Sequence, residues 1–132
     1  MNKVEIAIDT NTLIEIEKNN KDVISKIDKL ELNGAEICIT SPTYSEYYLG
    51  LMKLSLEKKE KGRQRLDKYK ILNTTRNSSK LLGEIKYTLS KAGTPTPVFD
   101  LFIASIAMDN GAPLVTQDGH FKSIPNLKVI MI

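Results

Sequence analysis

The stretch PVFDLFIASIAMDNGAPLVTQD, residues 97–118, contains the clearest structural signal in the chain. Its first part, Val98 to Asn110, is apolar at nearly every position, which predicts a helix buried on all sides. Pro97 suits the start of that helix, and Gly111 suits its end. Residues 113–116 then form an apolar run that favours a buried strand. A buried helix leading directly into a buried strand is typical of folds that mix helices with a central sheet.

Periodic segments on both sides of this stretch extend the pattern. Alternating apolar residues predict strands at 4–9, 36–40 and 127–132, with 70–73 as a further short strand or an extended crossing. Helical patterns cover 10–18, 22–32, 41–60, 63–69 and a segment from Ser78 or Ser79 to 91. Strands that alternate with helices predict an α/β fold, a sandwich in which helices flank a mostly parallel sheet. The length of 132 residues favours one domain, residues 1–132.

The composition excludes several kinds of site. The chain has one cysteine and one histidine, so it holds no disulfide framework, no cysteine-built zinc site and no cage of several histidines. If the protein is an enzyme, its chemistry depends mainly on carboxylates, hydroxyls, amides or cations. No apolar run reaches the ~18 residues that a membrane span needs. Residues 1–9 lack the features of a signal peptide, so a cytoplasmic location is the default expectation.

Four acidic residues share a position relative to the predicted elements. Asp9 ends the first strand, and Asp118 follows the strand at 113–116. Glu46 and Asp100 lie in the first turns of two predicted helices. Because the carboxyl ends of parallel strands meet at one edge of a sheet, we expect all four side chains to converge there.

Each acid also has an ordinary structural interpretation. Asp9 suits a helix N-cap, Glu46 a solvent-facing helical position and Asp118 a turn. Asp100 lies in an apolar run, where a lone carboxylate is costly unless it is paired, bound to a metal or stabilised by the free amides of a helix N-terminus. The joint placement of the four acids favours a shared site.

The positive charge is concentrated in one segment. Residues 53–91 hold twelve Lys or Arg and four Asp or Glu, a balance of +8, whereas the remainder has a balance of −5. This asymmetry indicates either a solvated helix face or a contact with nucleic acid. The candidates for contacts with the phosphates of a nucleic acid are Lys58, Lys59, Lys61, Arg63, Arg65, Lys68 and Lys70. Three aromatic residues on the helix before them suit base stacking, a core or a dimer surface: Tyr44, Tyr47 and Tyr48.

Four motifs occur in order along the chain: IDTNTLI at 8–14, SPTYSE at 41–46, DLFIASIA at 100–107 and LVTQD at 114–118. With these motifs the sequence resembles the PIN-domain ribonucleases, and within them the VapC-type toxins of toxin–antitoxin pairs. The resemblance extends over nearly the whole chain. It implies the same α/β sandwich and the activity of a metal-dependent endoribonuclease.

The resemblance also implies roles for particular residues. Mg²⁺ or Mn²⁺ would be held by four acids, which would also be the catalytic residues: Asp9, Glu46, Asp100 and Asp118. Asn11 and Thr116 would support them by hydrogen bonding. Two positions differ from the common pattern of the family: Gly119-His120 replaces a further acid, and Pro97-Val98-Phe99 replaces polar residues. The number of metal ions therefore stays open.

Partners follow from the same resemblance: an RNA substrate, a cognate antitoxin and a second copy of the chain, with no membrane. Tyr47, Leu51 and Leu54, along one predicted helix, would suit either protein surface. The alternatives are an RNA-processing nuclease without a toxin role and a non-catalytic domain that binds RNA or protein. A phosphatase is also conceivable from Asp9-Thr10-Asn11-Thr12, although Asn11 replaces the aspartate that would be its acid–base residue.

Overall fold

A five-stranded sheet, parallel throughout, organises the molecule, with the strand order β3-β2-β1-β4-β5. The computed structural model describes residues 3–132, so the first two residues of the expected domain lie outside it. The strands are β1 (Val4–Ile8), β2 (Ala35–Thr40), β3 (Lys70–Leu72), β4 (Leu114–Thr116) and β5 (Val129–Met131). The expectation of an α/β fold with a mostly parallel sheet is confirmed.

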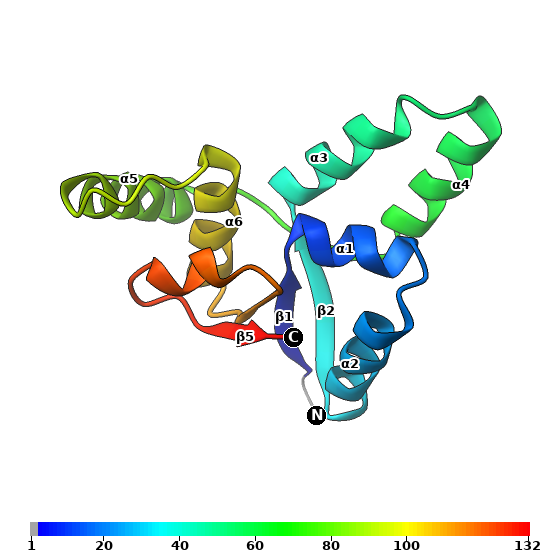
Figure 1. Ribbon diagram of the computed structural model, residues 1–132, viewed down its shortest axis with the longest axis horizontal. Coiled ribbons are helices and arrows are strands. Elements are labelled where there is room, and N and C mark those ends of the chain that lie inside the picture. The colour runs from blue at the N-terminus through cyan, green and yellow to red at the C-terminus, as the bar shows by residue number, and fades with distance from the viewer. Residues whose placement is uncertain (1–2) are drawn as a thin grey trace.

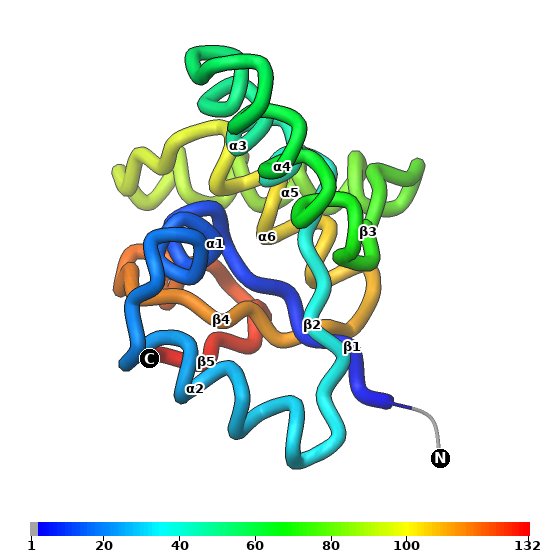
Figure 2. The backbone as a smooth tube through the Cα atoms, turned by 90° about the vertical axis from the view of Figure 1, so that its right-hand side faces the viewer, coloured from blue at the N-terminus to red at the C-terminus, as the bar shows by residue number. Residues whose placement is uncertain are grey.

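Six α-helices and one short 3₁₀ helix connect the strands. The helices are α1 (Thr10–Glu17), α2 (Lys21–Leu32), α3 (Ser41–Leu51), α4 (Leu56–Leu66), α5 (Arg76–Lys91), α6 (Val98–Asp109) and the 3₁₀ helix η1 (Gly119–Ser123). Helices α1 and α2 lie on one face of the sheet, and α5 and α6 lie on the other (Figures 1 and 2). Helices α3 and α4 extend beyond the carboxyl ends of β1 and β2, at the top of Figure 1.

The alternation of side chains along the strands builds a core on each face. Ile6 and Ile8 of β1 belong to the core under α1 and α2, whereas Ala7 belongs to the core under α5 and α6. Cys38 of β2, the one cysteine of the sequence, is fully buried in the core under α5 and α6. Burial, together with the charges of Glu5 and Glu36, raises the pKa of the Cys38 thiol to about 11. The thiol is therefore protonated at neutral pH and acts as a small apolar group.

The region that follows β2 differs from the sequence prediction. The helix expected over 41–60 ends at Leu51, and a new helix begins at Leu56. The side chain of Ser55 caps the new helix by accepting a hydrogen bond from the Lys58 amide at 3.4 Å. Gly62, which lies between the helices predicted at 41–60 and 63–69, is inside α4. The sequence pattern did not predict the break between Leu51 and Leu56, because the residues on both sides of it are good helix formers.

Smaller differences from the predicted boundaries occur at the ends of other helices and strands. Helix α5 begins at Arg76, two or three residues before the expected start at Ser78 or Ser79, because Thr75 and Ser78 form a reciprocal capping box. The last strand is limited to Val129–Met131. Helix α6 is buried over most of its length, yet Val98 and Phe99 in its first turn are about half exposed, so it is not buried on all sides.

Within residues 3–132, no helix combines the length and the apolar character needed to cross a membrane.

Candidate functional site

The four acids singled out in the sequence come from four connections at the carboxyl edge of the sheet. Asp9 follows β1 and caps α1, and Asp118 follows β4 and caps η1. Glu46 lies in the second turn of α3, which begins directly after β2. Asp100 lies in the first turn of α6. The parallel strands and the helix that directly follows β2 present three of these residues at one edge, and the charges of all three act on Asp100.

Asp9 is the most firmly held of the four. Its side chain is almost completely buried, at 3% exposed. One carboxylate oxygen accepts hydrogen bonds from the Thr12 amide at 3.0 Å and the Thr12 hydroxyl at 2.5 Å. The other oxygen accepts from the Thr116 hydroxyl at 2.5 Å. These three donors occupy both carboxylate oxygens and therefore fix the position and orientation of the Asp9 side chain at the end of β1.

Glu46 is held by a chain of threonine hydroxyls. Its Oε1 lies 2.6 Å from the Thr10 hydroxyl, which lies 3.1 Å from that of Thr43. The Thr43 hydroxyl is in turn 3.3 Å from that of Thr40. A carboxylate only accepts, and each hydroxyl has one proton, so Thr10 donates to Glu46 and accepts from Thr43. The chain connects the end of β2 to the first turns of α1 and α3.

Asp118 is bonded within its own turn. Its Oδ1 accepts from the His120 amide at 2.9 Å and lies 2.8 Å from Nδ1 of the largely exposed His120 ring. The amide is the main reason that the pKa of Asp118 lies below its usual value, and the ring contributes further. The Asp118 amide donates to the Thr116 hydroxyl at 2.9 Å, which connects this turn to Asp9.

The environment of Asp100 shifts its pKa in the opposite direction to that of Asp118. Its pKa is raised from the ordinary value of 3.8, first by burial and then by the negative charges of Asp118, Glu46 and Asp9. None of the causes that act on it is a hydrogen bond. The four carboxylates are therefore close enough to disfavour ionisation at Asp100.

This environment suits a divalent cation. In residues 3–132 no three carboxylate, thiol or imidazole groups are already gathered as metal ligands. The donor set is nevertheless the one that Mg²⁺ and Mn²⁺ prefer, because carboxylate oxygens are hard ligands. Glu46 and Asp118 each accept hydrogen bonds through only one carboxylate oxygen within the described residues, so the other oxygen of each is available to a cation. A cation among the four acids would also remove the repulsion that acts on Asp100.

Of the two residues expected to support the acids, Thr116 contacts one of them and Asn11 does not. Thr116 is buried and bonds to Asp9. Asn11 is exposed, and among the described residues its side chain makes no hydrogen bond to any of the four acids. Thr10 and Thr12, which the sequence interpretation did not single out, contact Glu46 and Asp9 instead. The signal for them was present, because the run from Asp9 to Thr12 is rich in side chains that cap helices.

The basic residues fall into two groups. Four of the seven candidates form ion pairs: Lys61 with Glu57, Arg63 with Glu60 and Asp67, Arg65 with Glu17, and Lys70 with Glu5. Within the described part of the chain, Lys58, Lys59 and Lys68 have no acidic partner, and Lys59 lies 5.7 Å from the centre of the Tyr48 ring. The group without acidic partners is the better source of contacts with phosphates.

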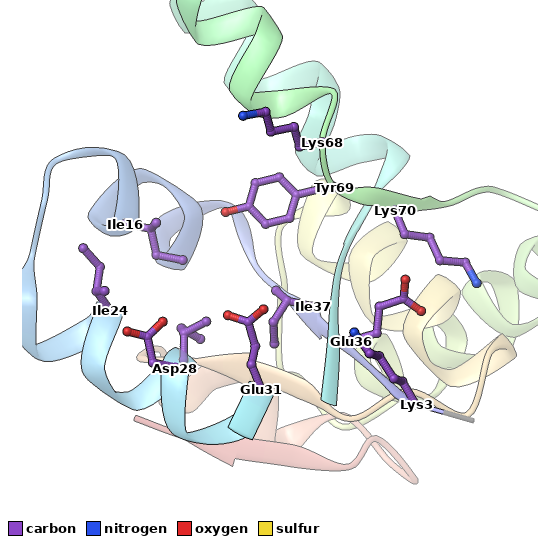
Figure 3. Close-up of a pocket in the computed structure, with 11 residues that line it drawn as sticks. Lys3, Ile16, Ile24, Asp28, Glu31, Glu36, Ile37, Lys68, Tyr69 and Lys70 are labelled. Atoms are coloured by element: carbon purple, nitrogen blue, oxygen red, sulfur yellow. The ribbon is translucent and has the colours of Figure 1, made fainter. Parts of the chain in front are cut away.

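The pocket in Figure 3 lies away from the acids. It has a volume of 340 Å³ and is lined by α2, by Glu36 and Ile37 near the amino end of β2, and by Tyr69. None of the four acids lines it. The candidate site is thus at the opposite end of β2.

The chain is similar over nearly its whole length to known proteins. The sequence model of the PIN domain matches residues 6–127. The tRNA(fMet)-specific endonuclease VapC of Salmonella typhimurium is 26% identical over 129 residues, which cover 96% of each chain. Ribonuclease VapC3 of Methanocaldococcus jannaschii is 36% identical over 103 residues, which cover 78% of this chain and 98% of that protein.

Solved structures of VapBC proteins contain chains with the same fold. A chain of VapBC2 from Rickettsia felis, bound to a DNA fragment from their promoter, superposes with a TM-score of 0.84 at 27% identity, covering 98% of this chain and 99% of that one. A chain of DNA-bound VapBC from Salmonella typhimurium superposes with a TM-score of 0.82 at 27% identity, covering 97% and 98%. The family match spans most of the sequence, and the fold agrees with it. The chain belongs to the PIN domain family, and VapC proteins are among its relatives.

Proposed function

We propose that this protein is a Mg²⁺- or Mn²⁺-dependent endoribonuclease, a single nuclease domain over residues 1–132, and the toxin of a toxin–antitoxin pair. Its substrate is single-stranded or loop RNA. The observation that carries the proposal is the placement of the four carboxylates, at the ends of β1 and β4 and in the first turns of α3 and α6. Burial and the charges of the other three acids raise the pKa of Asp100, which supports the same arrangement. Such a cluster repels a phosphodiester unless a cation neutralises it. Relatives named as an endonuclease and a ribonuclease support the same activity.

Each acid has its own part in the proposed site. Asp9, with three hydrogen-bond donors, is the fixed ligand that sets the position of the cation. Glu46 and Asp118 each contribute the oxygen that their neighbours leave free. Asp100 contributes the charge that the other acids disfavour when no cation is present. When bound, the cation supplies Lewis-acid stabilisation of the charge that builds up on the phosphate.

The proposed protein partners are a cognate antitoxin and a second copy of the chain. Similar chains occur in VapBC assemblies, which supports an antitoxin partner. Exposed apolar side chains at the end of α3 and in the turn before α4 support a protein surface there: Leu49, Met52 and Leu54. Leu51, which the sequence placed on this surface, is buried at 4% exposed and does not contribute.

The activity is tested on single-stranded RNA with wild-type protein and the Asp100→Asn variant. We expect cleavage with Mg²⁺ or Mn²⁺, none with EDTA, and a loss on the order of 100-fold or more in the variant. Asp28→Asn, which removes an exposed acid from α2, is the matched control and should cut like wild type. Circular dichroism verifies that both variants fold.

The toxin role has its own measurement. Expression of the wild-type protein should arrest growth, and expression of Asp100→Asn should not. An Asp100→Asn protein that is folded yet cuts as fast as wild type would refute the four-acid site. Cleavage without growth arrest would instead favour an RNA-processing nuclease.

A further inference from the structure

A second hollow adjoins the candidate site. It has a volume of 610 Å³ and lies between one side of α1, along its whole length, and the turn that follows β4. Asp118 belongs to its lining, so this groove and the acid cluster share a wall. We call it the α1–β4 groove; its other lining residues are Asn11, Ile14, Glu15, Lys18, Gln117 and Gly119.

The groove lies where the strand order changes direction. From β1 the chain continues to β2 on one side of the sheet, and β4 leads to β5 on the other side. The connections after β1 and β4 therefore diverge and leave an opening above the carboxyl ends of these neighbouring strands. In open parallel sheets this is the usual position of a ligand crevice. Figure 2 shows α1 next to β4 at this position.

The lining has the chemistry of a base-binding surface. Asn11 and Gln117 are exposed amides that make no side-chain hydrogen bonds within the described residues. An amide offers a donor and an acceptor together, as the edge of a nucleobase does. Ile14 adds apolar surface for the face of a ring.

The charges of the groove argue against a bare phosphate. Lys18 is its one basic residue, whereas Glu15 and Asp118 are acidic. Glu15 accepts a hydrogen bond from the Asn20 side chain at 2.8 Å, so one of its oxygens already has a donor within the protein. A neutral heterocycle therefore fits better than an anion, and Lys18 is available for the adjoining backbone. The volume is within the ~300–1,000 Å³ typical of small-ligand sites.

We infer that the α1–β4 groove binds an unpaired nucleobase next to the scissile phosphate, and that Asn11 and Gln117 hydrogen-bond to its edge. The inference rests on the proposed ribonuclease function and assigns Asn11 to the substrate instead of to the acids. Asp118 belongs both to the groove and to the carboxylate cluster. The phosphodiester next to a base bound in the groove therefore lies beside the cluster. The groove thus makes the protein selective for the base that flanks the cut.

The test is the base preference of cleavage. Wild type, Asn11→Ala and Gln117→Ala are given a pool of single-stranded RNA with random bases around the cut, and kcat/KM is compared for each flanking base. We expect the preference at one flanking position to fall by about tenfold in each variant. Gln64→Ala, which removes an exposed amide from α4, should keep the wild-type preference.

Binding without cleavage gives a second readout. In EDTA, fluorescence anisotropy compares oligonucleotides that differ only in the flanking base. The same variants should lose the same discrimination. All the substituted side chains are exposed, so thermal unfolding should be unchanged.

The outcomes separate this inference from the proposed function. Wild-type protein that cuts RNA with a base preference retained in Asn11→Ala and Gln117→Ala overturns the groove alone. A wild type that neither cuts nor binds RNA overturns both. An equal loss in Gln64→Ala would also overturn the inference, since the effect would then not belong to the groove.

Discussion

Single residues at the carboxyl edge differ in how strongly their neighbours hold them. Asp9 has three hydrogen-bond donors and is buried, whereas Asp100 has burial and like charges against it. In the metal site that we propose, the firmly held Asp9 would define the position of the cation, and Asp100 would gain most from its positive charge. Two aspartates at the same edge of the sheet are thus in very different surroundings.

Asp100→Asn should stabilise the metal-free protein at neutral pH. A carboxyl whose folded pKa is raised binds more protons in the folded state, so the free energy of unfolding falls as pH rises from the ordinary value of 3.8 through the raised one. Asparagine does not ionise and escapes this penalty. In EDTA the variant should therefore have the higher Tm at pH 7, and the difference should vanish at pH values below 3.8.

Mg²⁺ provides the control for this prediction. At about 100 times its Kd, a ligand that binds only the folded protein adds about 2.7 kcal/mol. Wild type should gain this stabilisation and Asp100→Asn much less, so the order of the two Tm values reverses. A variant that is no more stable than wild type in EDTA at pH 7 would contradict the repulsion inferred at Asp100.

Among the elements, the pair α3–α4 depends on a close approach. Gly62 of α4 faces Leu51 of α3, and a Cβ at Gly62 would lie 2.5 Å from Leu51 Cδ2. Leu51 is buried in the core under α1 and α2, so it has little space to move. The glycine therefore allows the second helix to pack against the first.

Gly62→Ala and Gly83→Ala should have opposite effects on stability. In an open helix, alanine gains about 1 kcal/mol over glycine, and a Cβ at Gly83 of α5 meets nothing within 4 Å. At Gly62, overpacking against Leu51 costs about 1–3 kcal/mol and offsets that gain. Urea unfolding measures both variants. Equal gains at the two positions would show that the α3–α4 contact is not tight.

Across the whole molecule, the opposite charges lie in different structural regions. The acids of the candidate site follow β1, β2 and β4 or begin α6, whereas α4 and the turn after it carry Lys58, Lys59 and Lys68 without acidic partners in the described residues. Single-stranded RNA that reaches the acids needs positive charge nearby to offset its own. The two regions together suit one polyanionic substrate.

Replacement of Lys58, Lys59 and Lys68 by alanine should weaken RNA binding without changing its base preference. For every lysine that binds a phosphate, its removal should make the negative slope of log K against log salt shallower by about 0.7. Anisotropy titrations in EDTA at several salt concentrations measure the slope. The matched control replaces three lysines of α2: Lys21, Lys26 and Lys29. An unchanged slope in the first variant would exclude α4 as the RNA-binding surface.

Much of the fold could be predicted from the sequence, because hydrophobic periodicity reports the face that a segment buries. The strand ending before Asp9 and the helix after Pro97 are examples. The break between Leu51 and Leu56 was missed, since no glycine or proline lies there and tertiary contacts determine where each helix ends. The partial exposure of Phe99 was missed for a related reason, because apolar character does not determine which residues find a neighbour.

The sequence by itself determined the alternation of strands and helices, the four acids and their places at element ends. These follow from local patterns and from the common direction of parallel strands. Only the tertiary structure decided that Thr10, from α1, reaches Glu46 of α3, and that Thr116 reaches Asp9. It also placed Asn11 and Gln117 in one groove beside the acids. Such contacts join residues more than thirty positions apart, and their partners are set by packing across the whole sheet.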